Sequence, residues 1–318
     1  MLTQLLTLIA GLLLIIFGAD WLVDGASAIA RKLKISEFVI GLTIVGFGTS
    51  CPELVVSVTG AIEGISDISI GNVIGSNIFN TLLILGLTAL LLPIDVTRSN
   101  RRRDIPVTLL VTVLLVVCGM SRTLFGLGAA DGLSRVEGIA FLVLFALYIF
   151  SCFKTDEKPQ EEGKTAGTSL AKAIFLTLLG LAGLVFGGKW FVDSAVWLAR
   201  EIGVSEKFIA ITLLAGGTSM PELAACIVAA AKKKGQLALG NILGSNIFNI
   251  LLILGTSAAI RPISFSGIDL VDMCALLLSI VLVCLSSYTF KKDKIDRYEG
   301  AIFLLVFIAY YVWLFIRL

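Results

Sequence analysis

The sequence predicts an all-α membrane protein with ten transmembrane helices, arranged as two inverted-topology repeats of five, in which helices 2 and 7 are broken. Two observations predict the class. Hydrophobic residues make up 57% of the 318 residues against 15% charged, and the mean hydropathy is +0.99. Apolar stretches also recur at the length of about 20 residues that crosses a bilayer. A third observation, a motif that returns at a constant offset, predicts the repeat.

The first five expected spans lie near residues 2–30, 36–62, 68–92, 105–120 and 133–152, and the second five near 171–199, 205–231, 236–260, 266–289 and 298–316. The apolar run from Leu2 to Ala30 is too long for a signal peptide and lacks a basic leader, so we expect it to be retained as a span. The polar segment 153–170 separates a first repeat, 1–152, from a second, 171–318.

Basic residues indicate the orientation. When the loops between ten spans are assigned alternately to the two sides, most of the 25 Lys and Arg residues gather on one side. The positive-inside rule makes that side cytoplasmic. We therefore expect a multi-pass protein of the cell (inner or plasma) membrane with both termini extracellular and the 153–170 linker cytoplasmic.

Composition excludes several classes of function. The chain has no His, which removes His-based acid/base catalysis and His-ligated zinc or haem sites. The six Cys residues form no C-x-x-C pair, so neither a disulfide framework nor a thiolate metal cluster is indicated. A net charge of +2 argues against a nucleic-acid partner. We expect no cofactor, and a monomer surrounded by the lipid bilayer.

The repeat is explicit in two motifs. Gly-Thr-Ser-Cys-Pro-Glu at 48–53 returns as Gly-Thr-Ser-Met-Pro-Glu at 217–222, an offset of 222 − 53 = 169, and Gly-Ser-Asn-Ile-Phe-Asn at 75–80 returns at 244–249 with the same offset. Because each half has an odd number of expected spans, the second half enters the membrane from the opposite side. Equivalent parts of spans 2 and 7, and of spans 3 and 8, then meet near mid-depth.

Glu53 and Glu222 are acidic residues inside otherwise apolar runs. An ionised side chain there costs at least about 2.5 to 3.5 kcal/mol. No basic residue lies at an equivalent depth in spans 2, 3, 7 or 8, so a bound cation is the most economical counter-charge. The alternative is a protonated, structural Glu that hydrogen-bonds a neighbouring helix.

Oxygen-bearing residues surround both carboxylates. Prolines follow each Gly-Thr-Ser and predict a broken helix with free carbonyls, and a polar stripe runs along spans 3 and 8. Gly71, Gly75, Gly240 and Gly244 fit a helix-packing pattern on the same helices, while Asn77 and Asn246 point off the stripe towards neighbouring backbone. Carboxylate, hydroxyl, amide and carbonyl oxygens suit Ca²⁺ or Na⁺ rather than Zn²⁺ or Cu⁺. The stripe residues are Asn72, Ser76, Asn80, Asn241, Ser245 and Asn249.

Two carboxylates carry at most two negative charges, which one Ca²⁺ or a few monovalent ions can neutralise. If either ion load fills the same oxygens but never both together, alternating access becomes exchange. Asp24 and Asp193 match across the repeats and are either helix caps or carboxylates on the access path. Asp20 aligns with Lys189, and the sequence gives no account of that asymmetry.

These motifs resemble the two α-repeats of the sodium/calcium exchanger family, in its prokaryotic form without a large regulatory loop. The resemblance implies exchange of several Na⁺, usually three, for one Ca²⁺, with spans 1 and 6 sliding across the others. Asn249 departs from potassium-dependent relatives, which carry Asp there, so K⁺ is not expected as cargo. The implied ligands are Glu53, Glu222, Thr49, Thr218, Ser50, Ser219, Ser76 and Ser245, flanked by Asn80 and Asn249, with the carbonyls of Gly46 and Ala215.

Three alternatives stay open. A proton/calcium antiporter would titrate Glu53 and Glu222 during its cycle. A passive cation channel is disfavoured, because one occluded site suits alternation better than multi-ion conduction. A membrane enzyme comes last, because no activated nucleophile stands beside the carboxylates.

Overall fold

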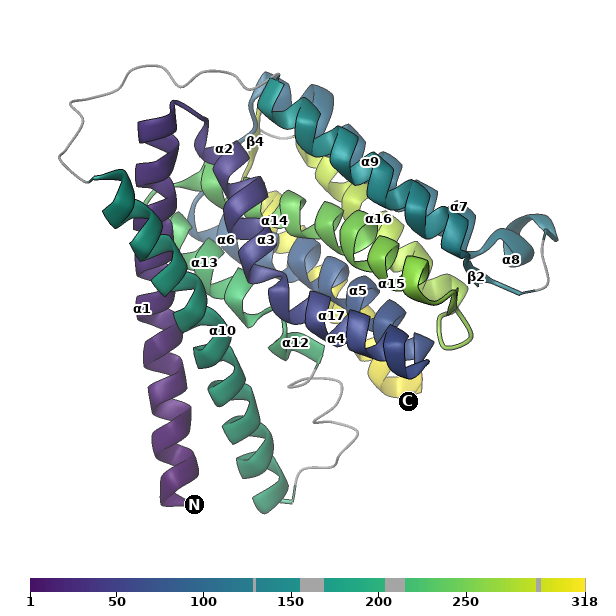
Figure 1. Cartoon of the computed structure of the whole chain (residues 1–318), viewed down its shortest axis with the longest axis horizontal. Helices are drawn as coiled ribbons and strands as arrows, with labels where there is room; N and C mark the ends of the chain where they lie inside the picture. The colour runs from purple at the N-terminus through teal and green to yellow at the C-terminus, as the bar shows by residue number, and fades with distance from the viewer. Residues whose placement is uncertain (128–129, 155–168, 204–214, 290–292, 318) are drawn as a thin grey trace.

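The computed structural model describes residues 1–127, 130–154, 169–203, 215–289 and 293–317. These residues fold into a bundle of helices, and the strands among them are two residues long (Figure 1). The all-α prediction is therefore confirmed. Most of the linker predicted at 153–170, and the start of the span predicted at 205–231, lie outside the described residues.

The first half begins with the long helix α1 and ends with α9. Its elements are α1 (Leu2–Leu33), α2 (Glu37–Ile40), η1 (Gly41–Val45), α3 (Gly46–Thr49), α4 (Cys51–Glu63), α5 (Ser66–Ile78), η2 (Phe79–Ile84), α6 (Leu85–Leu91), β1 (Ile94–Asp95), η3 (Asn100–Asp104), α7 (Ile105–Gly119), α8 (Ser121–Phe125), β2 (Gly132–Leu133) and α9 (Arg135–Lys154). The η segments are π-helical turns that continue the neighbouring α-helices.

The second half repeats this order. Its described elements are α10 (Leu170–Glu201), α12 (Ala215–Gly217), α13 (Met220–Ala231), α14 (Gly235–Ile247), η5 (Phe248–Leu254), α15 (Gly255–Ile260), β3 (Ile263–Ser264), α16 (Leu270–Ser286), β4 (Lys294–Ile295) and α17 (Arg297–Arg317).

Six continuous helical runs of the described chain are long and apolar enough to cross a membrane, and the bent pair 37–49 and 51–63 makes a possible seventh. The helices α7, α13 and α16 are shorter, at 15, 12 and 17 residues. The chain is thus a multi-pass membrane protein, whereas the count of ten spans stays a prediction. The six runs are 2–33, 66–91, 135–154, 170–201, 235–260 and 297–316.

The break predicted before Glu53 is present. Helices Glu37–Thr49 and Cys51–Glu63 meet at an angle of 49°, and Ser50 between them leaves the helical conformation at ψ 6°. The other motif does the same, because α12 ends at Gly217, α13 begins at Met220, and Ser219 has ψ 8°. A proline in the first turn of each following helix lacks an N–H that the helix start does not need.

Helices α1 and α10 lie side by side at one flank of the bundle (Figure 1). Each has 32 residues, or about 48 Å, well over the thickness of a bilayer core. Glycines bring the two backbones together: a Cβ atom on Gly180 would lie 2.5 Å from the nitrogen of Leu22, and one on Gly11 would lie 2.7 Å from that of Phe191. The pair is therefore closely packed by repeat-related contacts.

Burial separates a central pair of helical runs from the rest. The most apolar window of run 235–260 is 94% buried and that of run 66–91 is 78% buried, against 33% or less for the other four. A Cβ atom on Gly240 would overlap the carbonyl oxygen of Phe38, so its predicted packing role is confirmed. No described residue lies within 4 Å of a Cβ atom added to Gly71 or Gly75, so the packing role of these two glycines stays a prediction.

The short strands connect the two halves. Strand β1 pairs with β4, Ile94 opposite Ile295, and β2 pairs with β3, Leu133 opposite Ile263. The offset of 169 carries β1 onto β3. Each pairing thus joins one half to the other, and the two pairings are equivalent under the repeat.

Candidate cation-binding site

Glu53 and Glu222 lie at the centre of the bundle, in the first turns of α4 and α13. Their exposed fractions are 0% and 1%. A helix start follows each break, and its unpaired N–H groups and dipole favour a negative charge. Two buried carboxyl groups are therefore held at two equivalent helix N-termini.

The serines beside the breaks reach across to the opposite half. Ser50 Oγ donates to Glu222 Oε1 at 3.0 Å, and Ser219 Oγ donates to Glu53 Oε1 at 3.2 Å. Ser76 Oγ lies 3.5 Å from Glu53 Oε1. The structure thus brings both acidic motifs to one place, through hydrogen bonds that the repeat relates to each other.

The second oxygen of each carboxyl group has no partner. Glu53 Oε2 and Glu222 Oε2 are buried and accept no hydrogen bond from any described residue, and no described basic side chain forms an ion pair with either Glu. An unsatisfied buried polar atom costs about 1 to 3 kcal/mol, and more when it is charged. These two oxygens are therefore available to bind a ligand that would offset this cost.

The threonines of the two motifs are held by the polar stripe of the opposite half. Thr49 Oγ1 lies within donating distance of two acceptors, the Val45 carbonyl at 3.0 Å and Asn241 Oδ1 at 3.2 Å. Thr218 Oγ1 lies 3.4 Å from Asn72 Oδ1. Each hydroxyl has a single proton to donate to these acceptors, so its oxygen lone pairs are left for another group.

Asn80 and Asn249 are buried and use their amide N–H groups to join the halves. Asn80 Nδ2 donates to Asn246 Oδ1 at 3.3 Å, and Asn249 Nδ2 donates to Asn77 Oδ1 at 2.9 Å. The Oδ1 atoms of Asn80 and Asn249 themselves are buried without a partner among the described residues. Asn77 also donates to the Asn246 carbonyl at 3.2 Å, as predicted. The same prediction is wrong for Asn246, whose Nδ2 donates to the side chain of Thr81 at 2.7 Å.

Two backbone carbonyls were also predicted as ligands, those of Gly46 and Ala215. The Gly46 carbonyl faces Ser245 Oγ at 3.4 Å, so α3 and α14 meet at this point. Ala215 opens α12. Unpartnered oxygens come from both repeats and include two carboxylates, two amides and the lone pairs of hydroxyl groups. A hard cation with a high coordination number fits such a set.

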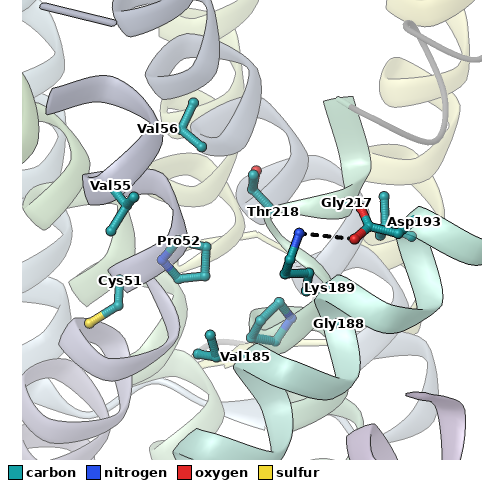
Figure 2. Close-up of a pocket in the computed structure, with 12 residues that line it drawn as sticks. Cys51, Pro52, Val55, Val56, Val185, Gly188, Lys189, Asp193, Gly217 and Thr218 are labelled. Carbon is teal, nitrogen blue, oxygen red and sulfur yellow. Dashed lines mark hydrogen bonds and ion pairs between the residues drawn. The ribbon is translucent and has the colours of Figure 1, made fainter. Parts of the chain in front are cut away.

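A cavity lies beside the two helix breaks (Figure 2). Its volume is about 530 Å³, and its walls are α4, α10 and the break before α13. Lys189 Nζ donates to Asp193 Oδ2 at 2.9 Å within this cavity. The cavity reaches Thr218 of the second motif. Its lining residues are Cys51, Pro52, Val55, Val56, Val185, Gly188, Lys189, Val192, Asp193, Gly217, Thr218 and Pro221.

Sequence reasoning missed an ionic contact at another end of the bundle. Lys232, just after α13, lies 2.7 Å from Asp20 Oδ1 and 2.6 Å from Asp24 Oδ1. Acidic residues one helical turn apart on α1 were the available signal. Sequence reasoning also missed the buried Asp272, which accepts a hydrogen bond from Tyr310 at 2.9 Å.

Comparison with known proteins places this arrangement in a family. The profile of the family described as sodium/calcium exchanger protein matches residues 3–154 and 172–316, which include both motifs. The chain belongs to the sodium/calcium exchanger protein family. It is therefore related to transporters.

Relatives of this exchanger-family protein match it over nearly its whole length. It is 39% identical to the putative antiporter CaxA of Alkalimonas amylolytica, covering 99% of both chains. It is 34% identical to the sodium/calcium exchanger MaX1 of Methanosarcina acetivorans, covering 98% of both. A solved structure of the sodium-calcium exchanger NCX_Mj, from a crystal soaked with Na⁺ and without Ca²⁺, superimposes with a TM-score of 0.84 at 34% identity and covers 96% of this chain and 97% of that one.

Proposed function

We propose that this protein is a secondary antiporter that exchanges Na⁺ for Ca²⁺ by alternating access. The observation that carries the proposal is the pair of buried carboxylates, Glu53 and Glu222, each with one oxygen that no described group satisfies. Cargo cations supply the missing counter-charge. Family membership and the match to the exchanger NCX_Mj support the same cargo.

The proposed ligands surround the two carboxylates in equivalent pairs. Both Oε2 atoms and the amide oxygens of Asn80 and Asn249 are free to bind a cation. The hydroxyl groups keep their lone pairs while donating to neighbours, and the backbone carbonyls of Gly46 and Ala215 complete the set. The hydroxyl ligands are Thr49, Thr218, Ser50, Ser219, Ser76 and Ser245.

The negative charge of the two carboxylates determines which ion loads can fill the proposed site. One Ca²⁺ neutralises two carboxylates, and so do two Na⁺, so either load can fill the site while a mixed load is penalised. We propose a stoichiometry of three Na⁺ to one Ca²⁺, which moves one net charge per cycle and makes transport electrogenic. Asn249 carries no charge, which leaves no third carboxylate for K⁺, and transport is proposed to be independent of K⁺.

The proposed topology has ten spans in two inverted repeats. The cross-half hydrogen bonds of Ser50 and Ser219, and the equivalent strand pairings β1–β4 and β2–β3, support a two-fold relation between the halves. The distribution of basic residues places both termini outside and the linker inside. In this orientation the cavity beside Lys189 opens to the outer side.

The test is Ca²⁺ uptake into proteoliposomes of the purified protein. Vesicles loaded with Na⁺ should accumulate Ca²⁺ when external Na⁺ is removed. A potential that is positive inside should speed this uptake and one that is negative inside should slow it, because net positive charge leaves with Na⁺. Adding K⁺ should change nothing. Uptake driven by an acidic interior and indifferent to Na⁺ would instead establish a proton/calcium antiporter, and uptake that needs no counter-ion at all would indicate a channel.

A further inference from the structure

Two pairs of positions that the repeat makes equivalent carry side chains of opposite charge. The offset of 169 relates Asp20 on α1 to Lys189 on α10, and Glu63 at the end of α4 to Lys232 after α13. An Asp20–Lys232 attraction therefore has a counterpart, Lys189–Glu63, in which both signs are reversed. If the two charges of a pair had been reversed independently of each other, the pair would not be expected to keep one positive and one negative member.

The first of these attractions is formed. Lys232 Nζ lies between Asp20 Oδ1 at 2.7 Å and Asp24 Oδ1 at 2.6 Å, and it also donates to the Asp20 carbonyl at 3.2 Å. The pKa of Lys232 is raised above its ordinary value. Partial burial alone acts to lower this pKa, but the hydrogen bonds and negative charge of Asp20 and Asp24 raise it by more. The charged contact fastens α1 to the end of α13, and these helices pack along each other.

The second attraction is not formed. Lys189 donates to Asp193 on its own helix at 2.9 Å, and both side chains are more than 60% exposed, at 69% and 62%. Glu63 is exposed, and no described residue forms an ion pair with it. The described helices α4 and α10 also lack the packing that joins α1 to α13.

The cavity fills the place where that second contact would form. It separates Val55 and Val56 of α4 from Lys189 and Asp193 of α10 (Figure 2). Glu63 follows Val56 by seven residues, about two helical turns, and so lies on the same face of α4. Closure of the cavity would bring Glu63 and Lys189 towards each other.

We propose that these charges form a two-position electrostatic latch. In the conformation described here, Lys232 with Asp20 and Asp24 holds α1 against α13; in the alternative conformation, Lys189 leaves Asp193 for Glu63 and holds α10 against α4. The close glycine packing of α1 on α10 makes the two helices shift together, so closing one gap opens the other. The latch rests on the proposed alternating access.

The test uses a reporter in the cavity wall. Val56→Cys is introduced into a background whose six native Cys residues are replaced by Ser or Ala, and the protein is reconstituted in nanodiscs, where a charged maleimide reaches both faces. The rate of labelling measures how long the cavity is open. Thermal unfolding confirms that every variant is folded.

Charge reversals then give a fixed order of labelling rates. Lys232→Glu replaces attraction to Asp20 and Asp24 with repulsion and should slow labelling about fivefold or more, the effect of losing roughly one ion pair. Adding Lys189→Glu, which repels Glu63, should restore the faster rate. Adding Glu63→Lys to these two should slow labelling again. The matched control is Lys233→Glu, an exposed neighbour without a described partner, which should leave the rate unchanged.

Equal labelling of Lys232→Glu and Lys233→Glu would overturn the latch, as would a triple variant that labels as fast as the double. The readout uses no ion gradient. If the variants follow this order of rates while the wild-type protein takes up no Ca²⁺ against Na⁺, the proposed cargo is contradicted and the latch is still supported.

Discussion

The centre of the molecule and its ends treat the internal repeat differently. At the centre the contacts of one half are reproduced in the other: Ser50 bonds Glu222 as Ser219 bonds Glu53, at 3.0 and 3.2 Å. Away from the centre two pairs of matched positions carry opposite charges, and Lys232 is paired between helices whereas Lys189 is paired within one. Under the proposed mechanism, one shared ion site requires the two halves to be equivalent at the centre, whereas alternation requires that the contacts at the two ends are not formed at the same time.

The largest effect should follow removal of either central charge. Glu53→Gln and Glu222→Gln keep the shape of the side chain but leave one carboxylate to balance Ca²⁺, so each should lower Ca²⁺ uptake about a hundredfold or more. The two losses should be alike because the positions are equivalent. Uptake is measured in Na⁺-loaded proteoliposomes.

The control for these variants is Glu201→Gln, which removes an exposed charge at the end of α10 and should leave uptake unchanged. Full activity in either central variant would show that the equivalence at the centre does not serve ion binding.

The cross-half serines should give the next largest effect. Ser50→Ala and Ser219→Ala each remove a hydrogen bond to a carboxylate, an interaction of about 1.5 to 3 kcal/mol, so each should weaken Ca²⁺ binding about tenfold or more. Equilibrium titration of the purified variants measures this. A loss in only one of the pair would break the proposed equivalence of the two halves.

Stability should be sensitive at the α1–α10 crossing. Gly11→Ala and Gly180→Ala each place a Cβ atom against the backbone of the other helix, an overpacking that costs about 1 to 3 kcal/mol. Both should lower the Tm of the purified protein by several degrees. Gly188→Ala is the matched control, since its Cβ would meet only Pro221, at 3.8 Å. If all three unfold together with the wild type, the two helices do not depend on close backbone packing.

The smallest effect should come from the residues that accept a hydrogen bond from Asn72 and Asn241, because these acceptors differ between the halves. Asn72 Nδ2 donates to Ser57 Oγ at 2.9 Å, while the equivalent Asn241 donates to Cys226 Sγ at 3.2 Å. Cys226→Ser makes the second contact like the first and should change the Ca²⁺ affinity less than about threefold, because both atoms accept the same donor. A change above tenfold in the same titration would show that this asymmetry tunes the site.

The sequence predicts the meeting of Glu53 and Glu222 because a repeat with an odd number of spans must be inverted. It does not predict that Ser50 bonds the opposite carboxylate. Helical spacing places Ser50 on the face of Glu53, but the helix breaks at Ser50, and beyond a break the periodicity no longer fixes direction.

Two further features are set by tertiary structure. The polar stripe assumed a uniform α-helix, yet the helix becomes π-helical at Phe79, and Asn80 bonds Asn246 of the other half. The partner of Lys232 lies 212 residues away on α1, so neither composition nor local spacing could identify it. Residues that act through local helix geometry are predictable, and those that depend on how distant helices cross are not.

Competition between Na⁺ and Ca²⁺ for the central site is the decisive measurement. Ca²⁺ is titrated calorimetrically into the purified wild-type protein at increasing Na⁺ concentrations, with choline holding the ionic strength constant. We expect one Ca²⁺ bound per chain and a Ca²⁺ affinity that falls more steeply than in proportion to the Na⁺ concentration, because more than one Na⁺ displaces each Ca²⁺. Ca²⁺ binding that is indifferent to Na⁺, or simultaneous saturation by both ions, would contradict this expectation.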